Sequence, residues 1–208
     1  PFAAFTSKWA LFGGLAIFLY VGAEVSIGSV MINFLHQPDI LNAGFDHAGR
    51  LLSFYWGGAM VGRAVGRAVL TRVPASRALA VAACVALLLC LLITQSGGVL
   101  ASAFGGVTWW EVAGFAALSI VLFNSIMFPT IFTLTRERSS APTPSTSGLL
   151  CMAIVGGAVL PVITGYTADH AGLTTAFFVP FVSYVCIAIF ALAGSRNAPR
   201  IESAPISA

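Results

Sequence analysis

Charged residues are scarce in this sequence. Asp, Glu, Lys and Arg make up 8% of its 208 residues and hydrophobic residues 58%, whereas an ordinary soluble domain carries about 25% charged residues. So few charges cannot cover the surface of a water-soluble protein of this length, and a soluble fold is excluded. The net charge of +3 does not indicate a nucleic-acid partner, because the basic residues lie singly or in pairs at the ends of apolar stretches and form no basic face.

Metal-binding and redox motifs are also absent from the sequence. The four cysteines all lie inside apolar stretches, without the Cys-x-x-Cys or Cys/His spacing of a metal site or a redox pair. We interpret them as small buried hydrophobic residues. The three histidines, His36, His47 and His170, are scattered singly near the ends of apolar stretches, where we expect them to be solvated. The sequence therefore predicts neither a metal nor another cofactor.

The patterns of an intramembrane enzyme are missing as well. A membrane serine protease needs a nucleophilic serine and a histidine at membrane depth, and none of the three histidines is at depth. No Gly-x-Ser-x-Gly sequence occurs. Glu24 is the only acidic residue deep inside an apolar stretch, so acid or metal chemistry has no second carboxylate. We predict that the protein is not an enzyme.

Six long apolar stretches dominate the sequence. Each is close to the roughly 20 residues with which a helix crosses about 30 Å of hydrocarbon. They cover residues 9–35, 51–71, 78–95, 112–135, 148–168 and 174–194. The first is much longer than the roughly 7–15 residues of a signal-peptide core and has no small-x-small cleavage site, so we expect it to stay in the membrane. The sequence predicts an all-α polytopic membrane protein with six transmembrane helices.

The basic residues indicate an orientation for these helices. Six spans place the amino end, the second and fourth loops and the carboxyl tail on one side of the membrane, and eight of the ten lysines and arginines fall there. They are Lys8, Arg67, Arg72, Arg77, Arg136, Arg138, Arg196 and Arg200. The loops on the opposite side contain only Arg50. The positive-inside rule therefore predicts that both ends of the segment are cytoplasmic.

Two polar residues, Glu24 and Asn124, stand near the middle of the first and fourth stretches. An acidic residue there costs on the order of 2.5–3.5 kcal/mol, so a polar cavity, a partner group or protonation must compensate Glu24. A neutral Glu24 bonded to a neighbouring helix is the structural alternative to a functional role. Phe128 follows Asn124 by one helical turn on the same predicted face. If the chain contains two three-helix repeats, Glu24 and Asn124 occupy equivalent positions, which is typical of a transporter binding site.

Small residues, prolines and arginines suggest how the helices pack and move. Glycines recur every four residues in the second stretch and form a ridge for close helix packing, at Gly58, Gly62 and Gly66. Arg63 and Arg67 lie in the same stretch, where they either mark topology or allow an arginine to pair with Glu137. Helix interruptions are predicted in the fourth and fifth stretches, at Pro129, Gly156, Gly157 and Pro161.

The sequence resembles the carboxyl-terminal half of a major facilitator superfamily sugar transporter, of the fucose/galactose/glucose:proton symporter family. The resembling segments come in family order and cover nearly the whole chain. They are Tyr20-Val-Gly-Ala-Glu24, Gly62-Arg-Ala-Val-Gly66-Arg67, Phe128-Pro-Thr-Ile-Phe132, Gly156-Gly157 through Pro161 to Gly165, and Ala168-Asp169 with Ala171-Gly172.

The resemblance implies twelve spans in two six-helix halves, with this chain as the second half and the sugar site between the halves. The first and fourth helices of each half line the cavity, which makes Glu24, Asn124 and Phe128 the expected substrate-binding residues. The residues expected to act in structure or gating are Gly62, Arg63, Gly66, Arg67, Pro129, Gly156, Gly157 and Pro161. The implied activity is proton-coupled symport of a monosaccharide by alternating access in the bacterial inner membrane.

Two residues differ from those of the L-fucose branch of the family, and the differences affect which sugar we expect as the substrate. This chain has Phe128 where that branch has a tyrosine, and Glu24 where it has an amide, so we expect glucose or galactose before fucose. The proton-coupling acids of the family lie in the amino-terminal half, so Glu24 is not assigned as the proton carrier.

The first residue of the chain indicates whether it is part of a longer protein. The chain begins at Pro1 without an initiator methionine, so we expect it to be part of a longer protein. Its partners would be the sugar, H+, the amino-terminal six-helix half and lipid. The alternative is a self-sufficient six-span protein that dimerises through the glycine ridge as a channel or a small transporter.

Overall fold

The structure is a computed structural model that describes residues 2–96 and 107–196. Over these residues it is built of helices, which confirms the all-α expectation. The long ones are α1 (Lys8–His36), α2 (Phe45–Leu70), α3 (Ala75–Gln95), α5 (Val107–Asn124), α6 (Met127–Arg138), α7 (Thr143–Met152), α8 (Gly156–Ala171) and α10 (Phe178–Arg196). The short element η1 (Phe2–Thr6) precedes α1, and two more, η2 (Ala153–Val155) and α9 (Leu173–Ala176), lie between α7 and α8 and between α8 and α10.

Five helical segments of the described residues are long and apolar enough to cross a membrane. They are Lys8–His36, Ala75–Gln95, Glu111–Arg138, Thr143–Ala171 and Leu173–Ser195. The predicted second span, observed as α2, is long enough but less apolar, because it contains Arg63 and Arg67 among several glycines. The protein is an integral membrane protein with at least these five candidate spans, and the count of six stays a prediction.

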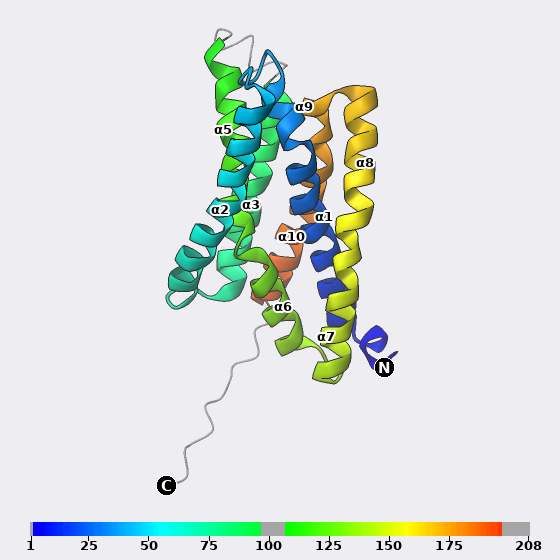
Figure 1. Cartoon of the computed structure of the whole chain (residues 1–208). Helices are drawn as coiled ribbons and strands as arrows, with labels where there is room; N and C mark the ends of the chain where they lie inside the picture. The colour runs from blue at the N-terminus through cyan, green and yellow to red at the C-terminus, as the bar shows by residue number, and fades with distance from the viewer. Residues whose placement is uncertain (1, 97–106, 197–208) are drawn as a thin grey trace.

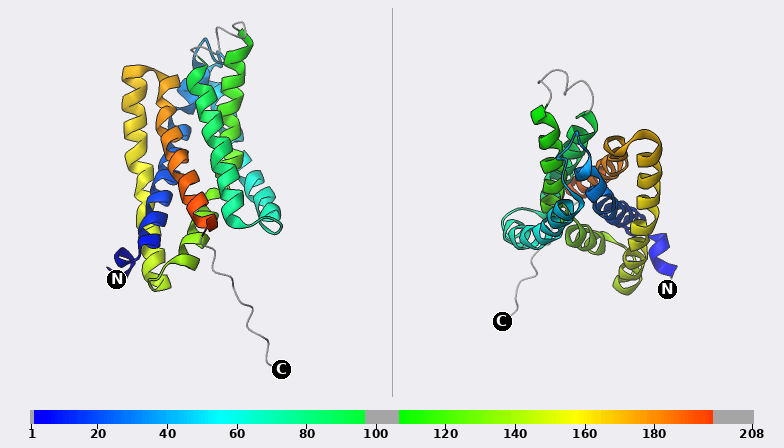
Figure 2. Two further views of the ribbon diagram at one scale, coloured as in Figure 1. Left: turned by 180° about the vertical axis from the view of Figure 1, so that it is seen from behind. Right: turned by 45° about the horizontal axis from the view of Figure 1, so that its top comes forward.

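Helix α1 occupies the centre of the bundle. It contacts α8, η2, α10, α6 and α2, and Figure 2 shows it passing between α8 and α10. The start of α1, the turn between α2 and α3 and the link between α6 and α7 lie at one end of the bundle (Figure 1, bottom). Lys8, Arg72, Arg77 and Arg138 therefore gather at that end. Its assignment to the cytoplasm stays a prediction, and Arg200 lies outside the described residues.

The fourth span is interrupted near its middle. Helix α5 ends at Asn124, residues 125–126 form a turn, and α6 begins at Met127. The cause is Pro129, which has no amide hydrogen and whose ring clashes with the carbonyl of the residue four positions earlier, Ser125. The predicted fifth span is also not one regular α-helix. It consists of α7, the 3-10 segment η2 and α8, and α8 begins at Gly156, one of the predicted interruptions.

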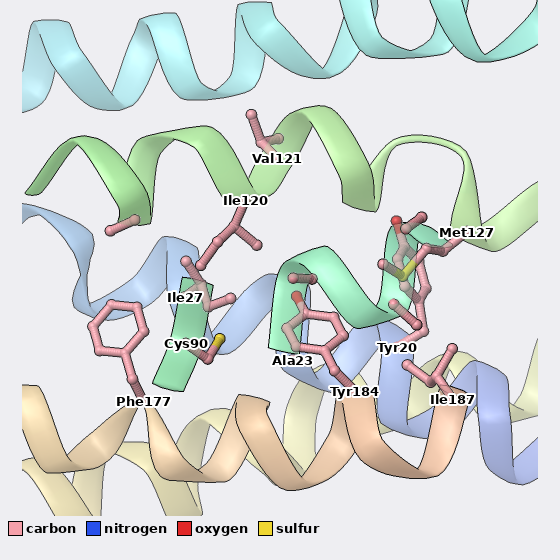
Figure 3. Close-up of a cluster of buried hydrophobic side chains, with 14 of the residues drawn as sticks. Tyr20, Ala23, Ile27, Cys90, Ile120, Val121, Met127, Phe177, Tyr184 and Ile187 are labelled. Atoms are coloured by element: carbon pink, nitrogen blue, oxygen red, sulfur yellow. The ribbon is translucent and has the colours of Figure 1, made fainter. Parts of the chain in front are cut away.

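Small and apolar side chains from these helices pack together to form the core. Figure 3 shows Ile27 of α1, Cys90 of α3 and Ile120 of α5 close together in this core, and Tyr20 of α1 near Ile187 of α10.

Glycines allow the closest helix contacts. A Cβ atom at Gly62 of α2 would lie 2.8 Å from the carbonyl oxygen of Leu122, and one at Gly156 of α8 would clash with the carbonyl oxygen of Phe18. The predicted ridge of α2 therefore packs onto the interrupted α5–α6 segment.

Candidate functional site

An open cavity lies where α1, α2, α6 and η2 converge on the α5–α6 interruption. Its volume is about 360 Å³, within the range of about 300–1,000 Å³ typical of small-molecule sites. The residues that line it are Tyr20, Val21, Glu24, Arg63, Ser125, Phe128, Pro129 and Ile154. Polar and aromatic groups from helices distant in sequence thus share one hollow.

Glu24 and Arg63 give the cavity its charged surface. Glu24 is partly buried on α1, and the Tyr20 hydroxyl one turn earlier lies next to its carboxyl group. The positive charge of Arg63 acts on the Glu24 carboxylate from α2. A carboxylate that accepts hydrogen bonds and a guanidinium that donates them therefore line the same cavity.

Phe128 gives the cavity its aromatic surface. Its ring is partly exposed and lies 6.2 Å from that of Tyr20, tilted by 54°, between ring centroids. It also stacks on Phe132, with centroids 6.1 Å apart and planes 24° from parallel. These contacts hold the Phe128 ring as a fixed apolar platform beside the charged groups.

Asn124 is not among the residues that line the cavity. Its side chain is fully buried, and its Oδ1 accepts a hydrogen bond of 2.8 Å from the hydroxyl of Tyr184 on α10. The structure thus brings Glu24 and Phe128 into one cavity, whose lining does not include Asn124. Asn124 and Phe128 do not share a helix face, because the helix is interrupted between them. Direct contact between Asn124 and a substrate stays a prediction.

Of the residues predicted for structure or gating, Arg63 and Pro129 line the cavity and the others lie outside its lining. Arg67 follows Arg63 by one turn of α2 toward the α2–α3 turn. It lines an adjoining hollow of about 340 Å³ that Arg63 and Pro129 also line. Gly157 of α8 faces α1, where a Cβ atom would lie 3.1 Å from a methyl carbon of Val21. Helix α8 therefore supports the part of α1 that lines the cavity. Pro161 lies within α8, one turn beyond Gly157.

Sequence reasoning missed that Arg63 lines the same cavity as Glu24. It treated Arg63 as a topology signal or as an arginine that could pair with Glu137. A signal was present, because an arginine within an apolar stretch needs a polar cavity or a partner charge. The candidate partner at depth was Glu24.

The cysteines and acids show no metal site in the part of the chain that the structure describes. No group of three His, Cys, Asp or Glu side chains there could hold an ion. All four cysteines are free. The expectation of burial holds for Cys90 but is wrong for Cys84 and Cys151, which lie on the outer surface of the bundle. The apolar character of a stretch does not distinguish its buried face from its exposed face.

Comparison with known proteins gives relatives along nearly the whole chain. No protein-family model matches it. The chain is 42% identical over 195 residues to a protein of Brucella abortus named glucose/galactose transporter, an alignment that covers 94% of this chain and 44% of that protein. It is 39% identical to a Helicobacter pylori protein named putative glucose/galactose transporter (93% and 45% covered). It is 30% identical to the L-fucose-proton symporter of Escherichia coli (92% and 40% covered).

Solved structures show the same fold. A crystal structure of FucP, a major facilitator superfamily transporter, in the outward conformation matches with a TM-score of 0.76 and 27% identity over 91% of this chain and 43% of that one. A structure of the E. coli fucose:proton symporter matches with a TM-score of 0.77 and 29% identity, with the same coverage. The chain spans less than half the length of the curated relatives it matches.

Proposed function

This chain corresponds to the carboxyl-terminal half of a major facilitator superfamily sugar transporter, and we propose that it supplies one wall of a monosaccharide site that opens alternately to the two sides of the membrane. The observation that carries the proposal is the open cavity in which Glu24, Arg63 and Phe128 meet. The amino-terminal half of the transporter would supply the opposite wall.

The three side chains match the chemistry of a hexose. Neighbouring hydroxyl groups of a pyranose can donate hydrogen bonds to the Glu24 carboxylate and accept them from the Arg63 guanidinium. The C–H face of the sugar ring can lie on the Phe128 ring, which Tyr20 and Phe132 hold in place. Glu24 and Arg63 would determine which sugar is bound. Both of them, together with the Phe128 ring, would contribute to the affinity.

Glucose or galactose is the proposed substrate class. The relatives named glucose/galactose transporter are 42% and 39% identical to this chain, whereas the relative named L-fucose-proton symporter is 30% identical. Proton coupling and a location in the bacterial inner membrane, with both ends of the segment cytoplasmic, are parts of the same proposal. Glu24 is assigned to the sugar, and the proton-carrying acid is assigned to the other half.

Uptake into proteoliposomes that contain the complete transporter tests this function. We expect saturable uptake of D-glucose and D-galactose, mutual competition between them, and weaker competition by L-fucose. A transporter with no saturable hexose uptake under a proton gradient would refute the proposal. Saturable uptake by this chain alone would instead favour the self-sufficient six-span dimer.

A further inference from the structure

The buried hydrogen bond between Asn124 and Tyr184 joins two helices behind the proposed sugar site. Asn124 is the last residue of α5, and Tyr184 lies in the middle of α10. Both side chains are fully buried, and the Tyr184 hydroxyl donates to Asn124 Oδ1 over 2.8 Å. Figure 3 shows Tyr184 within the hydrophobic cluster, where no solvent competes for its hydroxyl. A hydrogen bond in such surroundings strongly favours one arrangement of the two helices.

A second tyrosine approaches the same asparagine from α2. The Nδ2 atom of Asn124 and the hydroxyl of Tyr55 are both buried, and neither has a hydrogen-bond partner among the described residues. The Tyr55 hydroxyl lies near the Asn124 amide. An amide N–H donates and a tyrosine oxygen accepts, so a small adjustment of these side chains would join them. Asn124 is thus placed to connect α10 with α2.

Asn124 is the last residue before the helix is interrupted, so its hydrogen bonds affect how α6 is placed relative to α5. Directly after Asn124, residues 125–126 leave the helix, and Pro129 can donate no backbone hydrogen bond. The helical hydrogen-bond ladder therefore does not by itself fix the direction of α6 relative to α5. Ser125, the residue after Asn124, and Phe128, near the start of α6, both line the cavity. A side chain that anchors the end of α5 sets where these two residues lie.

We propose that Asn124 is a positioning residue for sugar binding: held by Tyr184 and Tyr55, it fixes the α5–α6 interruption and so places Ser125 and Phe128 in the cavity. The inference rests on the proposed transport function. It differs from the expectation that Asn124 contacts the sugar, because it assigns the effect of Asn124 to two tyrosines that do not line the cavity.

A double-mutant cycle in the complete transporter tests the proposal. Proteoliposome uptake gives the sugar KM of the wild type, Asn124→Ala, Tyr184→Phe and the double variant. We expect each single change to raise KM by about 3–10-fold, the loss typical of one hydrogen bond. We expect the double variant to be no worse than Asn124→Ala, because both changes remove the same interaction. Tyr166→Phe is the matched control: it removes the hydroxyl of a tyrosine that is 65% exposed, and it should leave KM unchanged.

Deoxyhexoses separate positioning from direct contact. If Asn124 positions other residues, Asn124→Ala should raise KM by a similar factor for glucose and for each monodeoxyglucose. A direct hydrogen bond predicts one deoxyhexose for which Asn124→Ala has no effect, and that result would overturn the proposal. Additive effects of Asn124→Ala and Tyr184→Phe would also overturn it.

A second tyrosine variant covers the case in which Tyr184→Phe does not fold. Tyr55→Phe should also raise KM, and its effect should be non-additive with that of Asn124→Ala. A wild-type KM for Tyr55→Phe would contradict the proposal that Tyr184 and Tyr55 both hold Asn124. Absence of saturable uptake in the wild type would refute the transport function itself, which is a different outcome from normal wild-type uptake with additive variants.

Discussion

The rings of Tyr20 and Phe128 lie 6.2 Å apart and are tilted by 54°, which links α1 to α6 beside the cavity. Glu24 follows Tyr20 by one helical turn and therefore lies on the same face of α1. An aromatic surface and a charged surface thus meet where the two predicted repeats come together.

Phe128→Tyr should change the preference among hexoses without abolishing transport. The ring that supports the sugar remains, and one hydroxyl is added where a polar group can meet a sugar hydroxyl. Competition of labelled glucose uptake by galactose and fucose measures the change. Phe115→Tyr adds the same hydroxyl on the outer surface of α5, where the phenylalanine is 59% exposed, and should leave the preference as in the wild type. An unaltered profile for Phe128→Tyr would leave Phe128 as a packing residue.

Arg63→Ala should weaken sugar binding by about 10–100-fold, the range expected for a hydrogen bond to a charged group. Arg63→Lys should restore only part of the affinity, because an ammonium keeps the charge but not the planar set of donors. Sugar KM measures both effects. Arg72→Ala is the control, since Arg72 is exposed in the turn between α2 and α3. Equal sugar affinity for Arg63→Ala and Arg72→Ala would show that Arg63 only marks topology.

Gly156→Ala should destabilise the protein by about 1–3 kcal/mol, the cost of forcing atoms into a packed interior. Its Cβ atom would meet the carbonyl oxygen of Phe18, and a backbone atom cannot move aside as a side chain can. Gly165→Ala on the same helix meets no atom within 4 Å and should have little effect. Thermal unfolding in detergent compares the two. Equal unfolding temperatures would show that α1 and α8 are not packed this closely.

The topology can be tested by labelling single cysteines in a variant that lacks the four native ones. Asp169→Cys lies near the end of α8 and Ala141→Cys in the link between α6 and α7, at opposite ends of the bundle (Figure 1). The excess of basic residues predicts labelling of Asp169→Cys from outside intact cells and of Ala141→Cys only after permeabilisation. The reverse pattern would contradict the predicted orientation.

Hydrophobic length and a lone acid indicated much of this arrangement from the sequence. Long apolar stretches define membrane helices because only a helix satisfies its own backbone in lipid. Glu24 marked a cavity because an acid at depth needs compensation.

The remainder of the site depends on contacts that periodicity does not encode. A repeat of four residues predicted one shared face for Asn124 and Phe128, but that rule requires a continuous helix, and Pro129 ends the continuity between them. The partner of Asn124 is Tyr184, sixty residues later. The reach of Arg63 toward Glu24 likewise depends on how α2 packs on α1.

The most direct test of the account compares Glu24→Gln and Glu24→Ala in proteoliposomes for sugar counterflow and for accumulation against a gradient. If Glu24 binds the sugar, the amide should retain much of both activities, because it can still bond to hydroxyls. Glu24→Ala should then lose both, because it leaves a sugar hydroxyl unpaired at about 1–3 kcal/mol. Intact counterflow with lost accumulation in Glu24→Gln would contradict this assignment and make Glu24 a coupling residue.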